Sequence, residues 1–410
     1  MTSDPDGSHI GALGVRPWVA YVGPFPFPWG QAGSRRVAGV AASILASGRD
    51  VVVVSGREPA GTSLVDTHAS GARLWLVGAP DEVHLRGPIA RQISQHLTSA
   101  RNAVAWLARQ GRAPSHVVVY GGGASYAFRV MRWARAAGVP VIADVVEWYS
   151  PRQFRGGAVS PAFLSAHLAL RMAYPRFDGV IAISEYLRHR YPALPTVVVP
   201  PTIGVAALDV ARGVRPVQER SDAHTLSLCY FGSPGRKDLL PAIIDGFAMA
   251  RSRFGPSPDL RLQVAGPDTN EVRGLLGGDI PTGVEVVGPL PQHEMGDFLR
   301  SADFSLLLRP DATYSRAGFP TKFVESLGYS TPVIANLTSD LDQYLLDGVT
   351  GFVVSGATAT DLALAIERAM GLTLDERERM RGHARDMALR AFDSTAYVAE
   401  IDRLLMATAR

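Results

Sequence analysis

Lysine is nearly absent from this sequence of 410 residues. Of its 41 basic residues, 39 are arginine and only two, Lys237 and Lys322, are lysine. A chain that uses arginine wherever either cation serves should keep lysine where a compact ammonium on a thin stem fits and a planar guanidinium does not. Both lysines are therefore candidate site residues before any motif is considered.

Cysteine and long apolar runs are also scarce. Cys229 is the one cysteine, which excludes an intramolecular disulfide, and its apolar surroundings TLSLCYFG predict a buried thiol in a strand. No uncharged apolar run approaches about 20 residues, so we expect no membrane-spanning helix. The N-terminus MTSDPDGSHIGALG lacks the basic and apolar regions of a signal peptide and predicts a frayed tail. These features predict a cytoplasmic protein.

Acidic residues are few in the first half of the chain. Residues 1–205 hold 20 Arg against 11 Asp and Glu, a net charge of +9, whereas residues 206–410 hold 21 basic and 27 acidic residues, a net charge of −6. The basic half predicts an anionic partner, such as a phosphate-bearing acceptor or a membrane surface at which the protein binds peripherally. The alternative is a set of arginines scattered over solvated helices. We expect no nucleic-acid partner.

Apolar runs alternate with helical stretches along the chain, which is typical of parallel sheets with crossover helices. In the first half the predicted strands are 18–23, 51–55, 74–77, 116–120, 139–145, 179–184 and 196–200, and the predicted helices are 35–48, 88–110, 126–138 and 161–174. In the second half the predicted strands are 226–232, 260–266, 283–288, 304–309 and 332–336, with helical sequence after each.

The length predicts two α/β domains of about 200 residues each. Residues 206–224 are rich in Pro, Gly and charge and predict a linker between domain 1–205 and domain 225–392. The last segment, 393–410, has helical apolar spacing and is predicted to pack back toward the first domain. The expected fold class is α/β, with two doubly wound Rossmann-like domains that face each other across a cleft and bind ligands at the carboxyl ends of their strands.

The segment FGSPGRKDLL gives a first candidate site. A strand ends at Gly232, a small flexible turn follows, and a helix begins near Lys237. The N–H groups of such a turn, together with the ammonium, can hold a diphosphate. Glycine turns after strands are common, so this pattern alone is weak.

Residues 314–336, YSRAGFPTKFVESLGYSTPVIAN, give a stronger pattern. Thr321 after Pro320 predicts the start of a short helix on which Lys322 and Glu325 face the same side. Lys322 lies in the first turn, where the helix dipole favours an anion, and Glu325 can accept two hydrogen bonds from a ribose diol. The structural alternative is a solvated Lys–Glu pair, but arginine would serve equally well in that role.

Together these motifs resemble the donor domain of retaining GT-B glycosyltransferases of the family-4 type. The resemblance rests on the strand-turn-lysine element, the VAGP loop around Gly266, EVVGPLPQHEM with Pro289 and Leu290, FPTKFVESLGYSTPVI and DLDQYLLDGVTGFVV. It extends more weakly to the early loop with Gly30 and Gly33 and to DGVIAISEYLRHRY.

The resemblance implies transfer of a sugar, of the hexosyl type, from a nucleoside diphosphate sugar to an acceptor hydroxyl, with retention of anomeric configuration. Lys237, Arg236 and Lys322 would stabilise the departing diphosphate. The residues implied to contact the donor are Gly232, Ser233, Gly266, Pro289, Leu290, Arg316, Gly318, Phe319, Pro320, Thr321 and Glu325. The ten histidines show no metal-ligand spacing and no Asp-x-Asp pair follows a strand, so we expect neither a metal nor a cofactor.

The sequence departs from the family pattern at two places. Ala317 stands where the family has the first of two glutamates, and Glu325 fits the second. The frequent histidine after the strand 139–145 is also missing, and Asp144 and Glu147 are the polar residues available there. These two are the only acids among residues 83–177, which predicts a catalytic or sugar-contacting role for both.

A small-molecule, glycan or lipid-linked acceptor is predicted to bind the N-terminal domain. Two loops after apolar strands, GPFPFPWGQAGSRR and DVVEWYSPRQFRGG, supply aromatic rings for stacking and arginines for an anion. The residues concerned are Trp29, Gly30, Gln31, Gly33, Arg36, Trp148, Tyr149, Arg152 and Arg155.

Two other functions stay open at this point. A nucleotide-sugar 2-epimerase on the same fold would use Asp144 and Glu147 as acid and base, and would turn over the nucleotide sugar without an acceptor. A non-catalytic nucleotide-sugar-binding protein would tolerate Ala317, and would bind the donor without turnover.

Overall fold

A computed structural model describes the chain except for residues 1–15, 29–31, 82–98, 205–224, 236 and 254–259. The chain divides into two compact units. Unit 1 comprises residues 1–202 and 394–410, and unit 2 comprises residues 203–393. The predicted linker 206–224 and residues 88–98 of the predicted helix 88–110 lie outside the described residues, whereas the rest of that helix contains α3.

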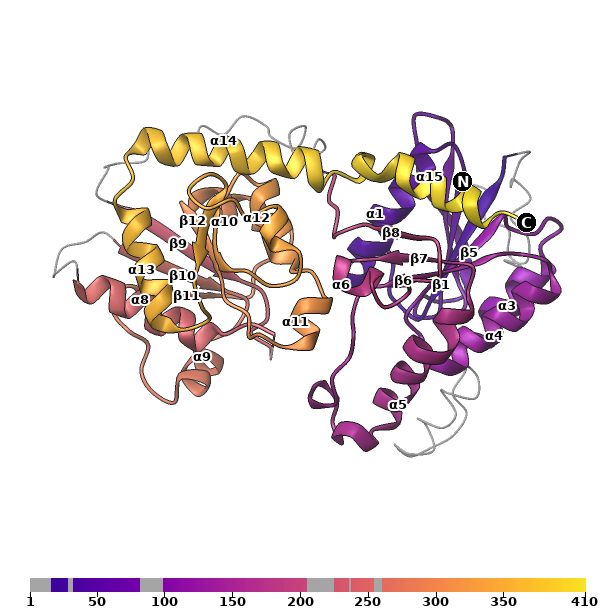
Figure 1. Ribbon diagram of the computed structural model, residues 1–410, viewed down its shortest axis with the longest axis horizontal. Coiled ribbons are helices and arrows are strands. Elements are labelled where there is room, and N and C mark those ends of the chain that lie inside the picture. The colour runs from indigo at the N-terminus through magenta and orange to yellow at the C-terminus, as the bar shows by residue number, and fades with distance from the viewer. Residues whose placement is uncertain (1–15, 29–31, 82–98, 205–224, 236, 254–259) are drawn as a thin grey trace. The chain divides into compact units, whose positions relative to one another are not determined.

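Unit 1 is a Rossmann-like α/β domain around one sheet (Figure 1). Its strands are β1 Trp18–Gly23, β2 Asp50–Ser55, β3 Gly61–Thr67, β4 Arg73–Gly78, β5 His116–Tyr120, β6 Val141–Val145, β7 Gly179–Ala182 and β8 Thr196–Val198. Its helices include α1 Ala32–Ala46, α3 Arg101–Arg109, α4 Gly123–Ala136, α5 Pro161–Leu168, α6 Glu185–Arg188 and α15 Val398–Thr408. The predicted helix 161–174 is α5, continued by a π-helical turn, Ala169–Ala173.

The sheet of unit 1 has the strand order β3-β4-β2-β1-β5-β6-β7-β8 and is parallel except for the β3–β4 pair. The seven predicted strands are confirmed, but β3 is not predicted by the sequence. Its residues GTSLVDT contain no apolar run because most of them are exposed at the sheet edge. The last helix, α15, buries Ile401, Leu404 and Leu405 in the same core as α1.

Unit 2 is a second Rossmann-like domain with an all-parallel sheet in the order β11-β10-β9-β12-β13-β14. Its strands are β9 Leu226–Phe231, β10 Leu260–Ala265, β11 Val284–Gly288, β12 Phe304–Leu307, β13 Val333–Asn336 and β14 Gly351–Val354. Its helices include α8 Leu240–Arg253, α9 Thr269–Leu276, α10 Met295–Ser301, α11 Thr313–Ala317, α12 Thr321–Gly328, α13 Ala359–Met370 and α14 Leu374–Ala391.

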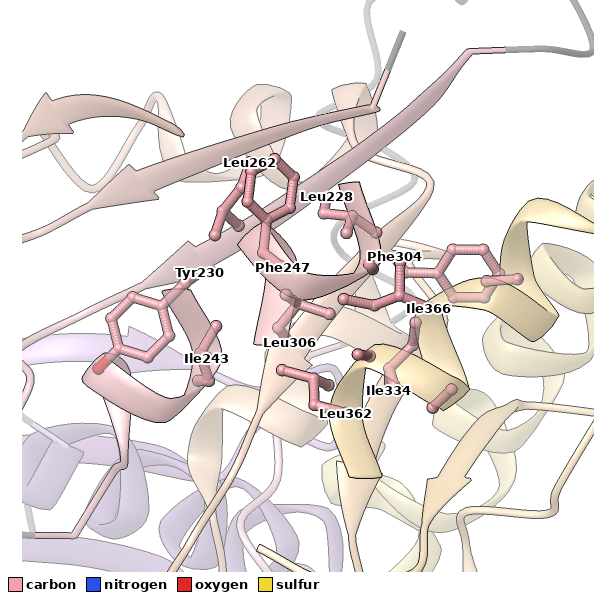
Figure 2. Packing of buried hydrophobic residues seen from close by; sticks show 14 of the residues in the cluster. Leu228, Tyr230, Ile243, Phe247, Leu262, Phe304, Leu306, Ile334, Leu362 and Ile366 are labelled. Carbon is pink, nitrogen blue, oxygen red and sulfur yellow. The ribbon is translucent and has the colours of Figure 1, made fainter. Parts of the chain in front are cut away.

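The core of unit 2 forms because side chains alternate across its buried strands. Leu228 and Tyr230 of β9 lie in one buried cluster with Ile243 and Phe247 of α8 and Ile366 of α13, and Figure 2 shows Tyr230 beside Ile243. Cys229 faces the other way, toward Leu299 of α10, and is fully buried. The predicted buried strand thiol is thus confirmed, and burial raises its pKa.

Each sheet contains one point where the strand order reverses, between β1 and β5 in unit 1 and between β9 and β12 in unit 2. After the two parallel strands at such a point, the chain turns toward opposite sides of the sheet. The two loops therefore separate and leave a crevice at the carboxyl ends of the strands. The expected ligand position of unit 2 is at the ends of β9 and β12.

Candidate functional site

Three glycines follow adjacent strands at the carboxyl edge of unit 2. Gly232, Gly266 and Gly288, at the ends of β9, β10 and β11, have φ values of 89°, 116° and 83°, a region that L side chains rarely adopt. A Cβ added to Gly266 would lie 2.7 Å from the carbonyl oxygen of Gly232. The loops after β9 and β10 are therefore in backbone contact, and only glycine fits between them.

Lys322 reaches this edge from the first turn of α12. Its Nζ donates hydrogen bonds to the hydroxyl of Tyr230, at 2.9 Å, and to the carboxylate of Asp238, with which it forms an ion pair. The Tyr230 hydroxyl in turn donates to Asp238 at 3.2 Å, and the ammonium lies 4.1 Å from the centre of the tyrosine ring. The predicted helix start at Thr321 is confirmed.

The Tyr230 side chain belongs to both the core and the site. Its ring packs in the unit 2 core, and Figure 2 shows the hydroxyl pointing away from the other labelled side chains. The Lys322 stem runs beside Gly232, so that a Cβ on this glycine would lie 2.7 Å from the lysine Cε. Strand end, glycine loop and α12 thus meet at one ammonium group.

The charges around Lys322 act in opposite directions. Burial lowers its pKa, whereas Asp238 and, more weakly, Glu325 raise it, and Arg309 lowers it further. The net effect is a pKa below the ordinary lysine value. Glu325 lies on the same helix, three residues further on, and is buried.

Arg309 fixes the segment that precedes α12. It follows β12, is buried, and donates hydrogen bonds from Nη1 to the carbonyls of Ser315 at 3.3 Å and Gly318 at 3.1 Å. Its own backbone is held on both sides by the Asn336 side chain, at 2.9 and 2.8 Å. Phe319 completes the anchoring, because its ring packs against the rings of Phe323, Tyr344 and Phe392.

The structure brings some of the predicted donor residues together but not all. Gly232 is adjacent to both Gly266 and Lys322. Lys237 lies on the same loop and is half-buried, Ser233 is exposed there, and Arg236 lies outside the described residues. Farther along, Pro289 is exposed, Leu290 packs against the Cys229 cluster, Pro320 is buried and Arg316 faces Asp311 at 3.6 Å.

Asp238, Tyr230 and Arg309 are the residues that sequence reasoning missed in unit 2. Asp238 follows Lys237 in a charged loop and has the sequence pattern of a solvated residue. Tyr230 lies in an apolar strand and Arg309 is one of 39 arginines. Of these three residues, only Asp238 could have been singled out from the sequence, because it directly follows Lys237, one of the two lysines of the chain.

In unit 1, Arg36 and Asp144 form a buried ion pair. Arg36 donates from Nε to both carboxylate oxygens of Asp144 at 3.1 Å and from Nη2 at 2.8 Å. The Tyr21 hydroxyl donates to the same carboxylate, and Arg36 Nη1 donates to the carbonyls of Val199 and Pro200. This pair connects α1 with the ends of β6 and β8.

This geometry changes the interpretation of both residues. Arg36 is predicted above to bind an anion and Asp144 to act in catalysis, yet each is almost fully buried and satisfied by the other. The contacts favour a structural role, which sequence reasoning missed because the two residues are 108 positions apart.

The other predicted residues of unit 1 lie near the carboxyl edge of its sheet. Glu147 accepts a hydrogen bond from Gln153 at 2.6 Å, and the Tyr149 ring packs against Phe154 at 5.5 Å. Burial raises the pKa of Tyr149, and the Glu147 charge adds to this effect. Trp148 contacts two guanidinium groups, with Arg171 and Arg190 at 5.5 and 4.8 Å from its ring centre.

The early loop is only partly visible. Gly33 begins α1, and a Cβ there would lie 3.1 Å from the Tyr120 hydroxyl. Trp29, Gly30 and Gln31 lie outside the described residues. Arg152 and Arg155 are exposed on the loop that follows β6.

The described residues contain no group of three or more His, Cys, Asp or Glu side chains placed to hold a metal ion. Among the helices that the structure describes, none is long and apolar enough to cross a membrane.

Both units match glycosyltransferase families. Residues 32–202 match the model described as "Glycosyl transferase 4-like domain", and residues 226–371 match "Glycosyl transferases group 1". The chain therefore belongs to the glycosyltransferases of the group 1 type and has the GT-B fold of two Rossmann-like domains.

Solved structures share this fold over nearly the whole chain. Anabaena HepE in complex with UDP and glucose is 14% identical, with 95% of this chain and 100% of that chain covered and a TM-score of 0.61. The trehalose-6-phosphate structure from E. coli bound with UDP-2-fluoro glucose is 12% identical, with 96% and 100% covered and a TM-score of 0.68. Sucrose-phosphate synthase from Thermosynechococcus elongatus is 14% identical, with 95% and 98% covered and a TM-score of 0.66.

A curated relative matches over a shorter segment. The D-inositol 3-phosphate glycosyltransferase of Streptosporangium roseum is 32% identical over 85 residues. The match spans 21% of this chain and 18% of that relative.

Proposed function

We propose that this protein transfers a sugar from a nucleoside diphosphate sugar to an acceptor hydroxyl, with retention of anomeric configuration and without a metal ion. The observation that carries the proposal is the position of Lys322, whose ammonium lies beside a glycine loop at the reversal point of the unit 2 sheet. The UDP and UDP-sugar complexes of structures with the same fold support a nucleotide donor.

Unit 2 is the proposed donor domain. When the bond between the anomeric carbon and the diphosphate oxygen breaks, negative charge collects on the diphosphate. The ammonium of Lys322 has three N–H groups, of which Tyr230 and Asp238 each accept one, so one remains to donate to a phosphate oxygen. Lys237 and the N-terminus of α12 add positive potential. Glu325 is proposed to accept hydrogen bonds from the ribose diol.

Retention is proposed from the family resemblance. The acceptor oxygen forms the new bond to the anomeric carbon on the face from which the diphosphate departs, and the departing phosphate oxygen takes the acceptor proton. Ala317 cannot supply the sugar contact of the family's first glutamate, because its side chain is a methyl group and fully buried. The N–H of Gly318 is bonded to the Tyr314 carbonyl at 3.0 Å. The proposed sources of this contact are therefore the backbone N–H groups of Ala317 and Phe319 or the side chains of Arg316 and Tyr314.

Unit 1 is the proposed acceptor domain. Its basic character, and the exposed Arg152 and Arg155 after β6, support an acceptor that carries negative charge. Glu147 is the remaining candidate to orient the attacking hydroxyl, because Asp144 is engaged with Arg36. Glu147→Gln should therefore lower turnover and leave nucleotide affinity nearly unchanged.

The test is release of nucleoside diphosphate from a panel of nucleotide sugars, measured with and without candidate acceptors. We expect release that depends on both a particular donor and an acceptor. Conversion of the nucleotide sugar without any acceptor would indicate the epimerase instead. Donor binding by calorimetry without turnover under any condition would indicate a non-catalytic binding protein, and either result would overturn the proposal.

A further inference from the structure

The Lys322 ammonium needs an explanation that the family resemblance does not supply. A lysine whose purpose is to meet a phosphate would be expected to remain exposed, yet its side chain is only 17% exposed and that of its partner Asp238 is 10% exposed. Removing an ammonium from water costs several kcal/mol unless charge and hydrogen bonds compensate. Burial of the Lys322 ammonium therefore carries a desolvation cost that its partners must offset.

The contacts show how it is held. Three groups restrain the ammonium before any ligand binds: the Asp238 carboxylate, the Tyr230 hydroxyl and the face of the Tyr230 ring. The Tyr230 hydroxyl also donates to Asp238. The Lys322 ammonium, the Tyr230 hydroxyl and the Asp238 carboxylate are thus each hydrogen-bonded to the other two. A flexible four-carbon side chain is thereby fixed in one direction.

We propose that Asp238, supported by Tyr230, is a positioning residue that fixes the Lys322 ammonium beside Gly232, where it meets the donor diphosphate. The inference rests on the proposed function and names two residues to which that function assigns no role. Asp238 does not touch the substrate in this account. It acts through Lys322, whose ammonium keeps one N–H beyond those that Tyr230 and Asp238 accept and would donate it to the diphosphate.

The position of Asp238 also affects the protonation of Lys322. The charged groups that act on Lys322 are Asp238 and Glu325, which favour the ammonium, and Arg309, which disfavours it together with burial. Because Asp238 is the largest favourable influence, Asp238→Asn should lower the pKa of Lys322 further. The ammonium would then lose its proton at lower pH, and the loss of activity at high pH should begin earlier.

The chain allows this to be measured directly, because it contains only two lysines. Protein labelled with ¹³C at lysine Cε gives two side-chain NMR signals, which a Lys237→Arg variant assigns. The Lys322 signal is titrated in the parent protein, in Asp238→Asn, and in Glu367→Gln as matched control. Glu367 is a carboxylate of the same unit that also forms an ion pair, with Arg253 at the last residue of α8, at the opposite end of that helix from Asp238.

We expect the Lys322 titration to move to lower pH in Asp238→Asn and to stay unchanged in Glu367→Gln. Asp238→Glu should restore it in part, and Tyr230→Phe, which keeps the ring, should shift it less than Asp238→Asn. The steady-state readout is kcat against pH, whose alkaline limb should move to lower pH in Asp238→Asn. An unchanged Lys322 titration, or activity lowered equally at every pH, would overturn the positioning role.

The NMR readout separates this inference from the proposed function. If the Lys322 titration moves as expected but the parent protein turns over no nucleotide sugar, the proposed function fails and the role of Asp238 in fixing Lys322 stands. If turnover depends on Lys322 but the titration does not respond to Asp238, the positioning role fails alone.

A second, independent observation concerns the outer face of α5 in unit 1. Four apolar side chains are exposed on α5, the π-helical turn that continues it and the short helical turn that precedes it: Val159 at 80%, Leu164 at 47%, Leu168 at 44% and Met172 at 43%. The last three are spaced by four residues along α5 and the π-helical turn, so they lie along one face. We call these four residues the α5 stripe.

Within residues 148–177, which carry the α5 stripe, the charged side chains other than histidine are four arginines. Glu147 and Asp178 lie immediately outside this segment, and Asp178 forms an ion pair with Arg410. All four arginines, Arg152, Arg155, Arg171 and Arg176, are exposed. An apolar stripe accompanied by arginines alone is complementary to an anionic lipid surface, where apolar groups enter the interface and guanidinium groups meet lipid phosphates.

We propose that the α5 stripe docks unit 1 on an anionic bilayer surface. The test is sedimentation of the full-length protein with vesicles of phosphatidylcholine alone and with 30% phosphatidylglycerol added. We expect binding to the anionic vesicles that weakens with salt, and at least tenfold weaker binding for the double variant Leu164→Glu, Leu168→Glu. Leu364→Glu, at a residue of unit 2 that is 48% exposed, is the matched control and should bind like the parent.

Equal binding to neutral and anionic vesicles, or unchanged binding of the double variant, would overturn this proposal. A concentration-dependent dimer in solution that the double variant abolishes, without vesicle binding by the parent, would assign the α5 stripe to self-association instead and would equally overturn it.

Discussion

The buried pair of Arg36 and Asp144 leads to a specific stability prediction. Asp144→Ala leaves the Arg36 guanidinium with only the carbonyls of Val199 and Pro200, and removes the acceptor of the Tyr21 hydroxyl. Burial opposes the charged guanidinium, but Asp144 raises its pKa, so the charge is lost only at a large cost. Removing one partner of such a pair costs about 3–5 kcal/mol, and unit 1 should lose that much free energy of unfolding.

The tryptophans make unit 1 measurable by itself. All six lie in its sequence, so tryptophan fluorescence during urea unfolding reports on unit 1. The double variant Arg36→Met, Asp144→Leu removes both charges and should recover part of the loss. Arg403→Ala, which breaks an exposed pair with Glu400, should cost less than about 1 kcal/mol. A similarly small cost for Asp144→Ala would refute the structural assignment of the pair.

Three further predictions follow from the geometry. Burial lowers the pKa of His116 to about 4, so the unfolded state binds more protons between about pH 6.5 and 4. Unit 1 should lose on the order of 2–3 kcal/mol as pH falls through this window, and His116→Gln should flatten that slope in urea titrations. Gly266→Ala forces a Cβ to within 2.7 Å of the Gly232 carbonyl oxygen and should weaken nucleotide binding at least about tenfold by calorimetry. Glu325→Ala should weaken binding of the nucleoside diphosphate by about 1.5–3 kcal/mol, and unchanged affinity would reassign the carboxylate.

The sequence predicts most of the strands and singles out Lys322 as a candidate, for a physical reason. Buried parallel strands require continuous apolar runs, and Lys322 stands out because this chain otherwise uses arginine. The edge strand β3 escapes prediction because an exposed strand needs no apolar run.

Long-range pairs escape prediction for a different reason. Asp238 meets Lys322 across 84 positions and Arg36 meets Asp144 across 108, and no periodicity connects such residues. An acid in an apolar strand can have a role in the site, which the sequence favoured for Asp144, or a buried partner, which the structure shows to be Arg36. The role of Tyr230 is likewise not predictable from its apolar strand, because its ring packs in the core while its hydroxyl accepts a hydrogen bond from Lys322.

The central claim is that unit 2 binds the donor diphosphate through Lys322, and turnover of Lys322→Ala tests it most directly. With the best donor and acceptor from the panel, and with unchanged thermal unfolding, kcat should fall at least about 100-fold, the magnitude expected for loss of one charge-stabilising group. Turnover near that of the parent protein would contradict the assignment of the donor site.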